Sequence, residues 1–468
     1  MTHIARKDES NLRPRGHPPS ATDTCVAQYY RCPDGYVRID VRGPLSSESG
    51  YFTFGNDVVC YGQLGKGQPS NTSIGNLVDT MDYSIVERGI AYLPFDPAQV
   101  ADNLRFELYL DTSSHRSAIW DSVLETIYYS LRSLMPVTLR RFLQKAWIIK
   151  QSKIPFPKWP VDHTVDSLFE QLLLLSIRTQ GVKRIPFIWF WPNGAPSCAV
   201  IGHDVETTLG REFSTKVMDL DDTYGIKSSF SIVPEQRYEV PTDYLSSIWE
   251  RGFEVIVQGL NHDGNLFRDQ NEYLASVEKI NAYGKQYGAN GFRSPVLYRN
   301  QKWFDALQFS YDTSVPNAGH FEAQRGGCCT VMPYFVGNIV ELPITTTQDY
   351  ALFNYLNKYS IDIWANQIQL IMGRHGFINF IIHPEYITQS REWDAYRSLL
   401  AHLVQLRDQK GLWIPTTGQV AQWWRERANM TLIEDRDGIR IEGEGAERAR
   451  VAYASEADGR LVFTFDGA

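Results

Sequence analysis

From about residue 185 onward, short apolar runs alternate with segments in which apolar residues recur at helical spacing. This alternation is typical of a parallel α/β sheet or barrel, in which ligands bind at the carboxyl ends of the strands. The pattern predicts strands at 198–201, 229–233, 253–257, 377–382 and 412–415, and helices at 212–223, 268–287, 300–307, 359–374, 391–409 and 418–427. Polar residues that follow the strands are therefore the first candidates for a functional site.

Separate regions of the chain precede and follow this α/β segment. The polar, proline-containing residues 1–24 predict a disordered tail. Residues 25–150 alternate apolar and polar positions, predicting an antiparallel, β-rich accessory domain that ends in helices at 118–149. Three prolines mark a linker, followed by a helix, in 151–185; the α/β domain then spans 186–428. Period-two alternation returns in 429–468 and predicts a small β element there.

Five short polar motifs follow strand-like runs, and their residue types suit a hydrolytic centre. They are His203–Glu206, Gln258–Gly264, Gly291–Pro295, Tyr311–Asp312 and His383–Pro384. A turn after a strand can aim both Asp204 and Glu206 into one pocket, where one acts as general base and the other binds a metal. The alternative for Asp204, at about even odds, is that it caps the following helix.

His262 lies in a turn-rich stretch beyond the strand at 253–257, where it can bind a metal or the substrate. Metal sites built from such loops often use a second ligand four residues away, but that position holds Gln258. A glutamine carbonyl is a poor ligand for zinc-like metals compared with imidazole. A hydrogen-bonded turn histidine therefore remains an equal alternative for His262.

His383 follows the strongest buried-strand pattern of the chain and precedes Pro384, which restricts it to an extended backbone. A histidine fixed at a strand end is a good candidate general acid. Arg293 is suited to pair with Asp204 or Asp312, because its guanidinium is always charged and forked. The alternative for Arg293 is an ordinary surface salt bridge.

Composition and net charge limit the classes of binding partner that we expect. A net charge of −8 and the lack of a Lys/Arg run give no reason to expect nucleic-acid binding. We expect no membrane span and, because residues 1–20 lack the apolar core of a signal peptide, a cytoplasmic protein. The six cysteines predict packed, reduced thiols. The aromatic run 185–191 is interpreted as a core strand, with a glycan-stacking surface as the alternative.

The order of these motifs resembles the polysaccharide deacetylases with a NodB homology domain (carbohydrate esterase family 4), over about residues 195–425. The resemblance implies an irregular (β/α) barrel and a metal-dependent hydrolase of carbohydrate metabolism that removes N-acetyl groups from an amino sugar or glycan. It implies that Asp204 is the base, Arg293 orients it, His383 is the acid and Asp312 tunes nearby charge. Glu206 and His262, with Gln258 at the third position, would hold zinc, cobalt or nickel. Asn261 and Tyr298, beside the same motifs, are candidate substrate-binding residues.

Gln258 departs from the family pattern, which has a histidine there and completes the metal-binding triad. Two other functions therefore stay open: a metal-independent amidohydrolase acting on a small amide, and a non-catalytic glycan-binding protein. A cytoplasmic amino-sugar precursor fits the expected compartment better than a cell-wall polymer. The role of the accessory domain and the formation of a homo-oligomer are left open by the sequence.

Overall fold

The computed structural model describes residues 21–55, 58–110, 154–436 and 438–466. Most of the predicted tail and all of the predicted helical segment 118–149 lie outside these residues. Helix α1 begins at Ala21, so the last residues of the predicted tail are helical rather than disordered.

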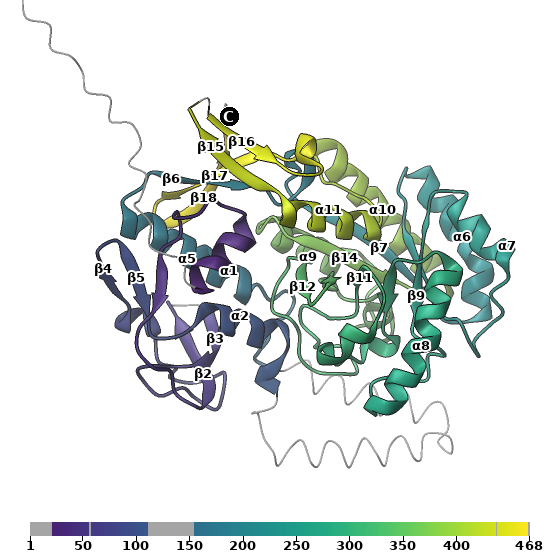
Figure 1. The fold of residues 1–468 in the computed structure, drawn as a ribbon. Helices are drawn as coiled ribbons and strands as arrows, with labels where there is room; N and C mark the ends of the chain where they lie inside the picture. Colours follow the sequence, from purple (N-terminus) through teal and green to yellow (C-terminus); the bar gives the residue numbers. More distant parts are fainter. Residues whose placement is uncertain (1–20, 56–57, 111–153, 437, 467–468) are drawn as a thin grey trace, which may run out of the picture.

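An eight-stranded sheet forms the centre of the barrel-like part (Figure 1). Its strand order is β12-β13-β11-β10-β9-β8-β7-β14, and every pair is parallel except β12 with β13. The strands are β7 (Cys198–Val205), β8 (Ser229–Ile232), β9 (Glu254–Gln258), β10 (Gly291–Arg293), β11 (Tyr311–Asp312), β12 (Tyr334–Val336), β13 (Ile339–Glu341) and β14 (Phe377–Ile382). The predicted α/β, barrel-like domain is confirmed at this level.

The helices of this part agree with the predicted pattern with two exceptions. They are α6 (Thr208–Thr223), α7 (Thr242–Trp249), α8 (Gln270–Tyr287), α9 (Asp362–Met372), α10 (Ser390–Lys410) and α11 (Thr417–Asn429). The pattern missed α7, which has only eight residues. The predicted helix at 300–307 is a 3₁₀ helix, Gln301–Ala306, which is too short to show helical periodicity.

The predicted strand at 412–415 is wrong. After α10 the chain forms a single parallel bridge, between Trp413 and Cys198. Strand β8 pairs with β7 from Gly202 onward, so only the first residues of that edge of β7 accept another segment. A short apolar run therefore has room for one bridge and not for a strand.

The sheet curls until the segment after β13 lies beside β14, and side chains join the two. Asn379 donates its amide to the carbonyls of Leu342 and Pro343, at 3.2 Å each. The hydroxyls of Thr345 and Thr346 donate to the carbonyls of Phe377 and Asn379, at 2.8 and 2.7 Å. No ladder of backbone bonds between β13 and β14 occurs in the described part of the chain, so this seam makes the barrel irregular.

The N-terminal part combines two small sheets with helices. Strands β2 (Ser49–Phe54) and β3 (Val58–Gln63) form an antiparallel hairpin. Strand β5 (Ile90–Leu93) pairs antiparallel with β4 (Ile85–Glu87) but parallel with β1 (Ile39–Val41), so the antiparallel expectation holds only in part. Helices α1 (Ala21–Tyr30), α2 (Pro97–Arg105) and α5 (Thr164–Gln180) pack against these strands.

The C-terminal strands are present, but they involve an earlier segment. Strands β15 (Thr431–Asp435) and β16 (Gly438–Glu442) form a hairpin. Strand β17 (Val451–Ala457) pairs with both β18 (Arg460–Phe465) and β6 (Arg184–Ile188). Residues 185–188 therefore belong to the sheet of β6, β17 and β18 and not to the barrel sheet.

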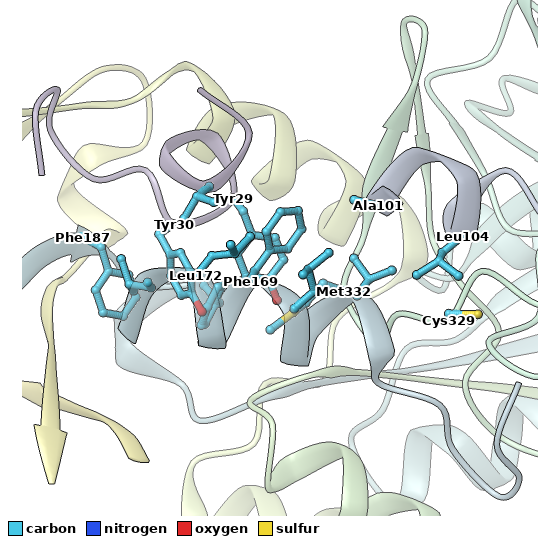
Figure 2. Packing of buried hydrophobic residues seen from close by; sticks show 14 of the residues in the cluster. Tyr29, Tyr30, Ala101, Leu104, Phe169, Leu172, Phe187, Cys329 and Met332 are labelled. Atoms are coloured by element: carbon cyan, nitrogen blue, oxygen red, sulfur yellow. The ribbon is translucent and has the colours of Figure 1, made fainter. Parts of the chain in front are cut away.

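One hydrophobic core joins the N-terminal part, the C-terminal sheet and one side of the barrel. Figure 2 shows Tyr29 and Tyr30 of α1 against Phe169 and Leu172 of α5, with Phe187 of β6 at one end of the cluster. Trp189 and Trp191, just after β6, are buried, so the core interpretation of the aromatic run is confirmed.

Two further expectations concern the whole chain. All six cysteines are free thiols, and five of them are buried, as predicted. Within the described ranges, no helix combines the length and the apolar character that crossing a bilayer would need.

Candidate active site

The predicted polar motifs meet at the carboxyl ends of the parallel strands. Asp204 lies near the end of β7, Gln258 ends β9, Arg293 ends β10 and His383 follows β14. Register reinforces this, because Arg293 is paired with Gln258 across β10 and β9. A parallel sheet carries all its carboxyl ends on one edge, so residues far apart in sequence reach one site.

Asp204 and Arg293 are buried side by side within the barrel. Asp204 is 3% exposed and Arg293 is fully buried, with 3.7 Å between Nη1 of the arginine and Oδ1 of the aspartate. Gly202 makes room for the guanidinium, since a Cβ there would lie 3.1 Å from Nη2 of Arg293. The arginine charge is thus internal and faces the carboxylate, and the alternative of a surface salt bridge does not apply.

His383 is held by Asp349, a fully buried residue that the sequence did not single out. Oδ1 of Asp349 lies 2.7 Å from Nδ1 of His383, and Oδ2 accepts the backbone N–H of His383 at 2.8 Å. Burial alone would lower the pKa of His383, but the charges of Asp349 and Glu206 outweigh it and hold the pKa well above its usual value. The protonated imidazole is therefore favoured, and its Nε2 faces Glu206 at 3.6 Å.

Glu206 is the centre of contacts from three side chains. Its Oε1 lies 2.7 Å from Nε2 of His262, 3.6 Å from Nε2 of His383 and 3.3 Å from Nε2 of Gln258. Burial would raise the pKa of Glu206, yet the two histidines hold it well below its usual value. Glu206 is therefore a carboxylate that accepts a hydrogen bond from Gln258 and forms ion pairs with two histidines.

Gln258 connects the two carboxylates. Its amide nitrogen lies 3.2 Å from Oδ2 of Asp204 and 3.3 Å from Oε1 of Glu206. Ionised carboxylates only accept hydrogen bonds, so the NH₂ end of the amide must face them. The side chain is 1% exposed, which fixes it between the two acids.

His262 adopts a left-handed backbone conformation, with φ 55°, in the loop after β9. Arg237, from the loop after β8, donates Nη2 to Nδ1 of His262 at 3.0 Å and to its carbonyl oxygen at 2.9 Å. His262 is thus both a turn residue and a neighbour of the site. The turn fixes its backbone, and its ring reaches Glu206.

Asp312 lies in the barrel wall and binds other groups. Its two oxygens accept the backbone N–H and the hydroxyl of Ser314, at 2.9 and 2.8 Å. Glu341, across the β11–β13 pair, shares this environment; burial and the charge of Asp312 raise its pKa well above normal. The residue in contact with His383 is Asp349, so the tuning role expected of Asp312 has a closer candidate.

The two candidate substrate-binding residues lie on neighbouring loops. Asn261 is partly exposed, and its side-chain oxygen accepts the backbone N–H of Asp263 at 3.2 Å, as in a tight turn. The ring of Tyr298 packs against Gly264, where a Cβ would be 3.5 Å from Cε2 of the tyrosine. A substrate-binding role for either remains a prediction.

Three residues at the site were missed from the sequence. Arg237 stands in a loop and Asp349 at the start of a short helical segment, and neither has a local signal, because only tertiary packing brings them to the histidines. Glu385 had a weak signal, since it lies two residues after His383; its Oε1 accepts the backbone N–H of Glu206 at 3.2 Å. Burial raises the pKa of Glu385 to about 7.

Asp204, Glu206 and His383 each offer one potential ligand atom for a metal ion, and these atoms lie within 4.8 Å of one another. The group shares only Glu206 with the predicted set of Glu206, His262 and Gln258. Its histidine is the one paired with Asp349, and both carboxylates already accept bonds from Gln258.

No family model and no curated protein sequence matches this chain. Solved structures similar to about half of it include a protein from Mycobacterium smegmatis described as a polysaccharide deacetylase, with 16% identity, 51% of this chain and 93% of that chain covered, and a TM-score of 0.41. Others are the peptidoglycan deacetylase PdaC from Bacillus subtilis (11%, 49% and 93%, 0.32) and Puue allantoinase (12%, 50% and 92%, 0.39). Similarity at this level concerns part of the fold, so the chemistry has to come from the site itself.

Proposed function

We propose that this protein is a carbon–nitrogen hydrolase of the deacetylase type that removes an N-acetyl group from an amino sugar or glycan. The supporting observation is a carboxylate and a histidine that meet in one buried site, each held by a buried partner of opposite charge. Asp204 is paired with Arg293, and His383 is paired with Asp349, which holds the pKa of His383 well above its usual value. A carboxylate base and a protonated histidine acid are the two groups that amide hydrolysis needs.

In this proposal Asp204 takes a proton from water as the water oxygen attacks the acetamide carbonyl carbon. A C–O bond forms, and the carbonyl oxygen gains negative charge in a tetrahedral intermediate. The intermediate then collapses: the C–N bond breaks and His383 donates its Nε2 proton to the leaving nitrogen. Water and the amide are thereby converted to acetate and a free amine, and Asp349 stabilises the charged His383 before transfer.

Glu206 has an orienting role in this scheme. It contacts both His262 and His383, and Glu385 accepts its backbone N–H. A carboxylate with so many donors is poorly basic, which leaves Asp204 as the better base. Glu206 would therefore fix the two histidines relative to Asp204.

The test is acetate release from a panel of N-acetylated amino sugars and short glycans, with wild type, Asp204→Asn and the control Asp408→Asn. Asp408 is an exposed helical residue with a surface ion pair to Arg407. The proposal expects turnover that Asp204→Asn lowers by roughly 10²–10⁴-fold and Asp408→Asn leaves unchanged. Acetate release that survives Asp204→Asn would refute the assigned base, and absence of release from the whole panel would refute the substrate class.

A second candidate is hydrolysis of a small cyclic or linear amide. The observation that favours it is the depth of the site, since Asp204, Gln258 and His383 are 3%, 1% and 5% exposed. A small molecule reaches such residues more easily than a polymer does. Turnover of small amides without acetate release from any sugar would favour this candidate.

A further inference from the structure

We propose that this site holds no transition metal. Gln258 places hydrogen-bond donors where a metal would have to bind, and Arg237 places one where a metal-binding histidine needs an acceptor. The inference deepens the proposed function and rests on it only where catalysis is concerned. It concerns the cofactor and the two residues that replace it, and it can be measured without any substrate.

The first observation is the position of the Gln258 amide. Its NH₂ group donates to Asp204 and to Glu206, the two carboxylates that a cation would bridge. The amide thus supplies positive hydrogen atoms where a metal would supply charge. For a metal to bind, the amide would have to turn and break both bonds in an environment where it is 1% exposed.

The second observation is the partner of His262. A histidine that binds a metal through one ring nitrogen usually donates the N–H of the other to a carboxylate or a carbonyl. Here the group at Nδ1 is Arg237, which can only donate. Nδ1 must therefore carry the lone pair, and the ring proton sits on Nε2, facing Glu206 at 2.7 Å.

This tautomer removes His262 from any ligand set that uses Nε2. The backbone carbonyl of His262 also accepts from Arg237, so two hydrogen bonds hold the arginine in place. The remaining histidine, His383, has Nδ1 bound by Asp349. That contact leaves Nε2 of His383 available, so one imidazole and two carboxylates that already accept hydrogen bonds from Gln258 are the potential ligands among the described residues, a weaker set for zinc than one with two imidazoles.

The inference predicts that the two substitutions Arg237→Gln and Gln258→His together create a zinc site. The carbonyl oxygen of a glutamine at 237 can accept a hydrogen bond from Nδ1–H and so leave the lone pair on Nε2, while a histidine at 258 adds an imidazole. Arg211→Gln is the matched control, because Arg211 is bound to the carbonyl of Glu239 and contacts none of the site residues.

Zinc chloride is titrated calorimetrically into metal-stripped wild type, both single variants, the double variant and the control. We expect no saturable binding to wild type or Arg211→Gln, and about one zinc per chain in the double variant. Each single variant should bind zinc more weakly than the double variant, by roughly 10–100-fold. Stoichiometric zinc binding by metal-stripped wild type would overturn the inference.

A second measurement does not depend on the folding of a variant. Long-range ¹H–¹⁵N correlation in ¹⁵N-histidine-labelled wild type reports which ring nitrogen of His262 carries the proton. A proton on Nε2 alone supports the inference, whereas a proton on Nδ1 overturns it. Acetate release by chelator-treated enzyme at an unchanged rate supports both proposals; loss of release that zinc restores overturns the inference alone. If no amide is hydrolysed under any condition, only the proposed function fails.

Discussion

Replacing Asp349 with asparagine tests the assignment of His383 as the general acid. The substitution keeps the shape of the side chain but removes the charge that lies 2.7 Å from Nδ1 of His383. Buried hydrogen bonds to charged groups contribute about 1.5–3 kcal/mol, and one pKa unit corresponds to about 1.36 kcal/mol. The pKa of His383 should therefore fall by about 1–2 units.

The direction of the pH effect follows from the role of the residue. A general acid must be protonated, so activity declines as pH rises through its pKa. In Asp349→Asn the alkaline limb of the kcat profile should move to lower pH by about 1–2 units, so kcat at a pH on that limb should fall by roughly 10–100-fold.

The stability of the folded protein should change with pH in the same direction as activity. A histidine whose pKa is raised in the folded state contributes stability that is fully present below the pKa of the unfolded chain. This contribution is lost as pH rises through the raised value, so wild type should lose it over neutral to alkaline pH. Asp349→Asn should lack much of this pH dependence.

The assay is acetate release across the pH range, with urea denaturation at each pH and Asp394→Asn as control. Asp394 is 58% exposed and pairs only with Arg397 on the surface of α10. If the alkaline limb of Asp349→Asn coincides with that of wild type while the variant stays folded, His383 is not the acid that this limb reports.

Two further predictions concern support for the site. Glu107→Gln removes one partner of the buried ion pair with Arg299, whose Nε donates to Glu107 at 2.8 Å, and should lower the free energy of unfolding by about 3 kcal/mol; a urea midpoint like that of wild type would contradict this. Gly210→Ala would bring a Cβ within 2.3 Å of Oε2 of Glu385 and push that carboxylate off the N–H of Glu206, so turnover should fall by about tenfold with little change in melting temperature. Unchanged turnover would mean that the Glu385 contact is dispensable.

The sequence predicted the strands whose burial is complete. Runs such as 198–201 and 377–382 are apolar except for Asn379, because β7 and β14 are covered on both faces, and that pattern needs no tertiary information. Strands β10 to β13 have only two or three residues, which is too short for any period to appear. The run at 412–415 had the right composition, but β8 already pairs with that edge of β7 from Gly202 to Val205.

The candidate site was predictable where residues directly follow strands. Asp204, Gln258, Arg293 and His383 could be found because the carboxyl end of a strand is a defined position in sequence. Their partners could not be found, because Asp349, at the start of a helical segment, and Arg237, in a loop, reach the histidines only through packing. The consequence is specific: the departure at Gln258 was visible in the sequence, while the contact of Arg237 with Nδ1 of His262 was not.

The seam between β13 and β14 has a consequence for the acid itself. Asp349 follows the segment on one side of the seam, and His383 follows the strand on the other. The threonine hydroxyls and the Asn379 amide that join these segments therefore also set the spacing of the His383–Asp349 pair. The pKa of His383 thus depends on how tightly the two segments of the seam are held together. A change that loosens the seam should lower the pKa of His383 without altering His383 or Asp349.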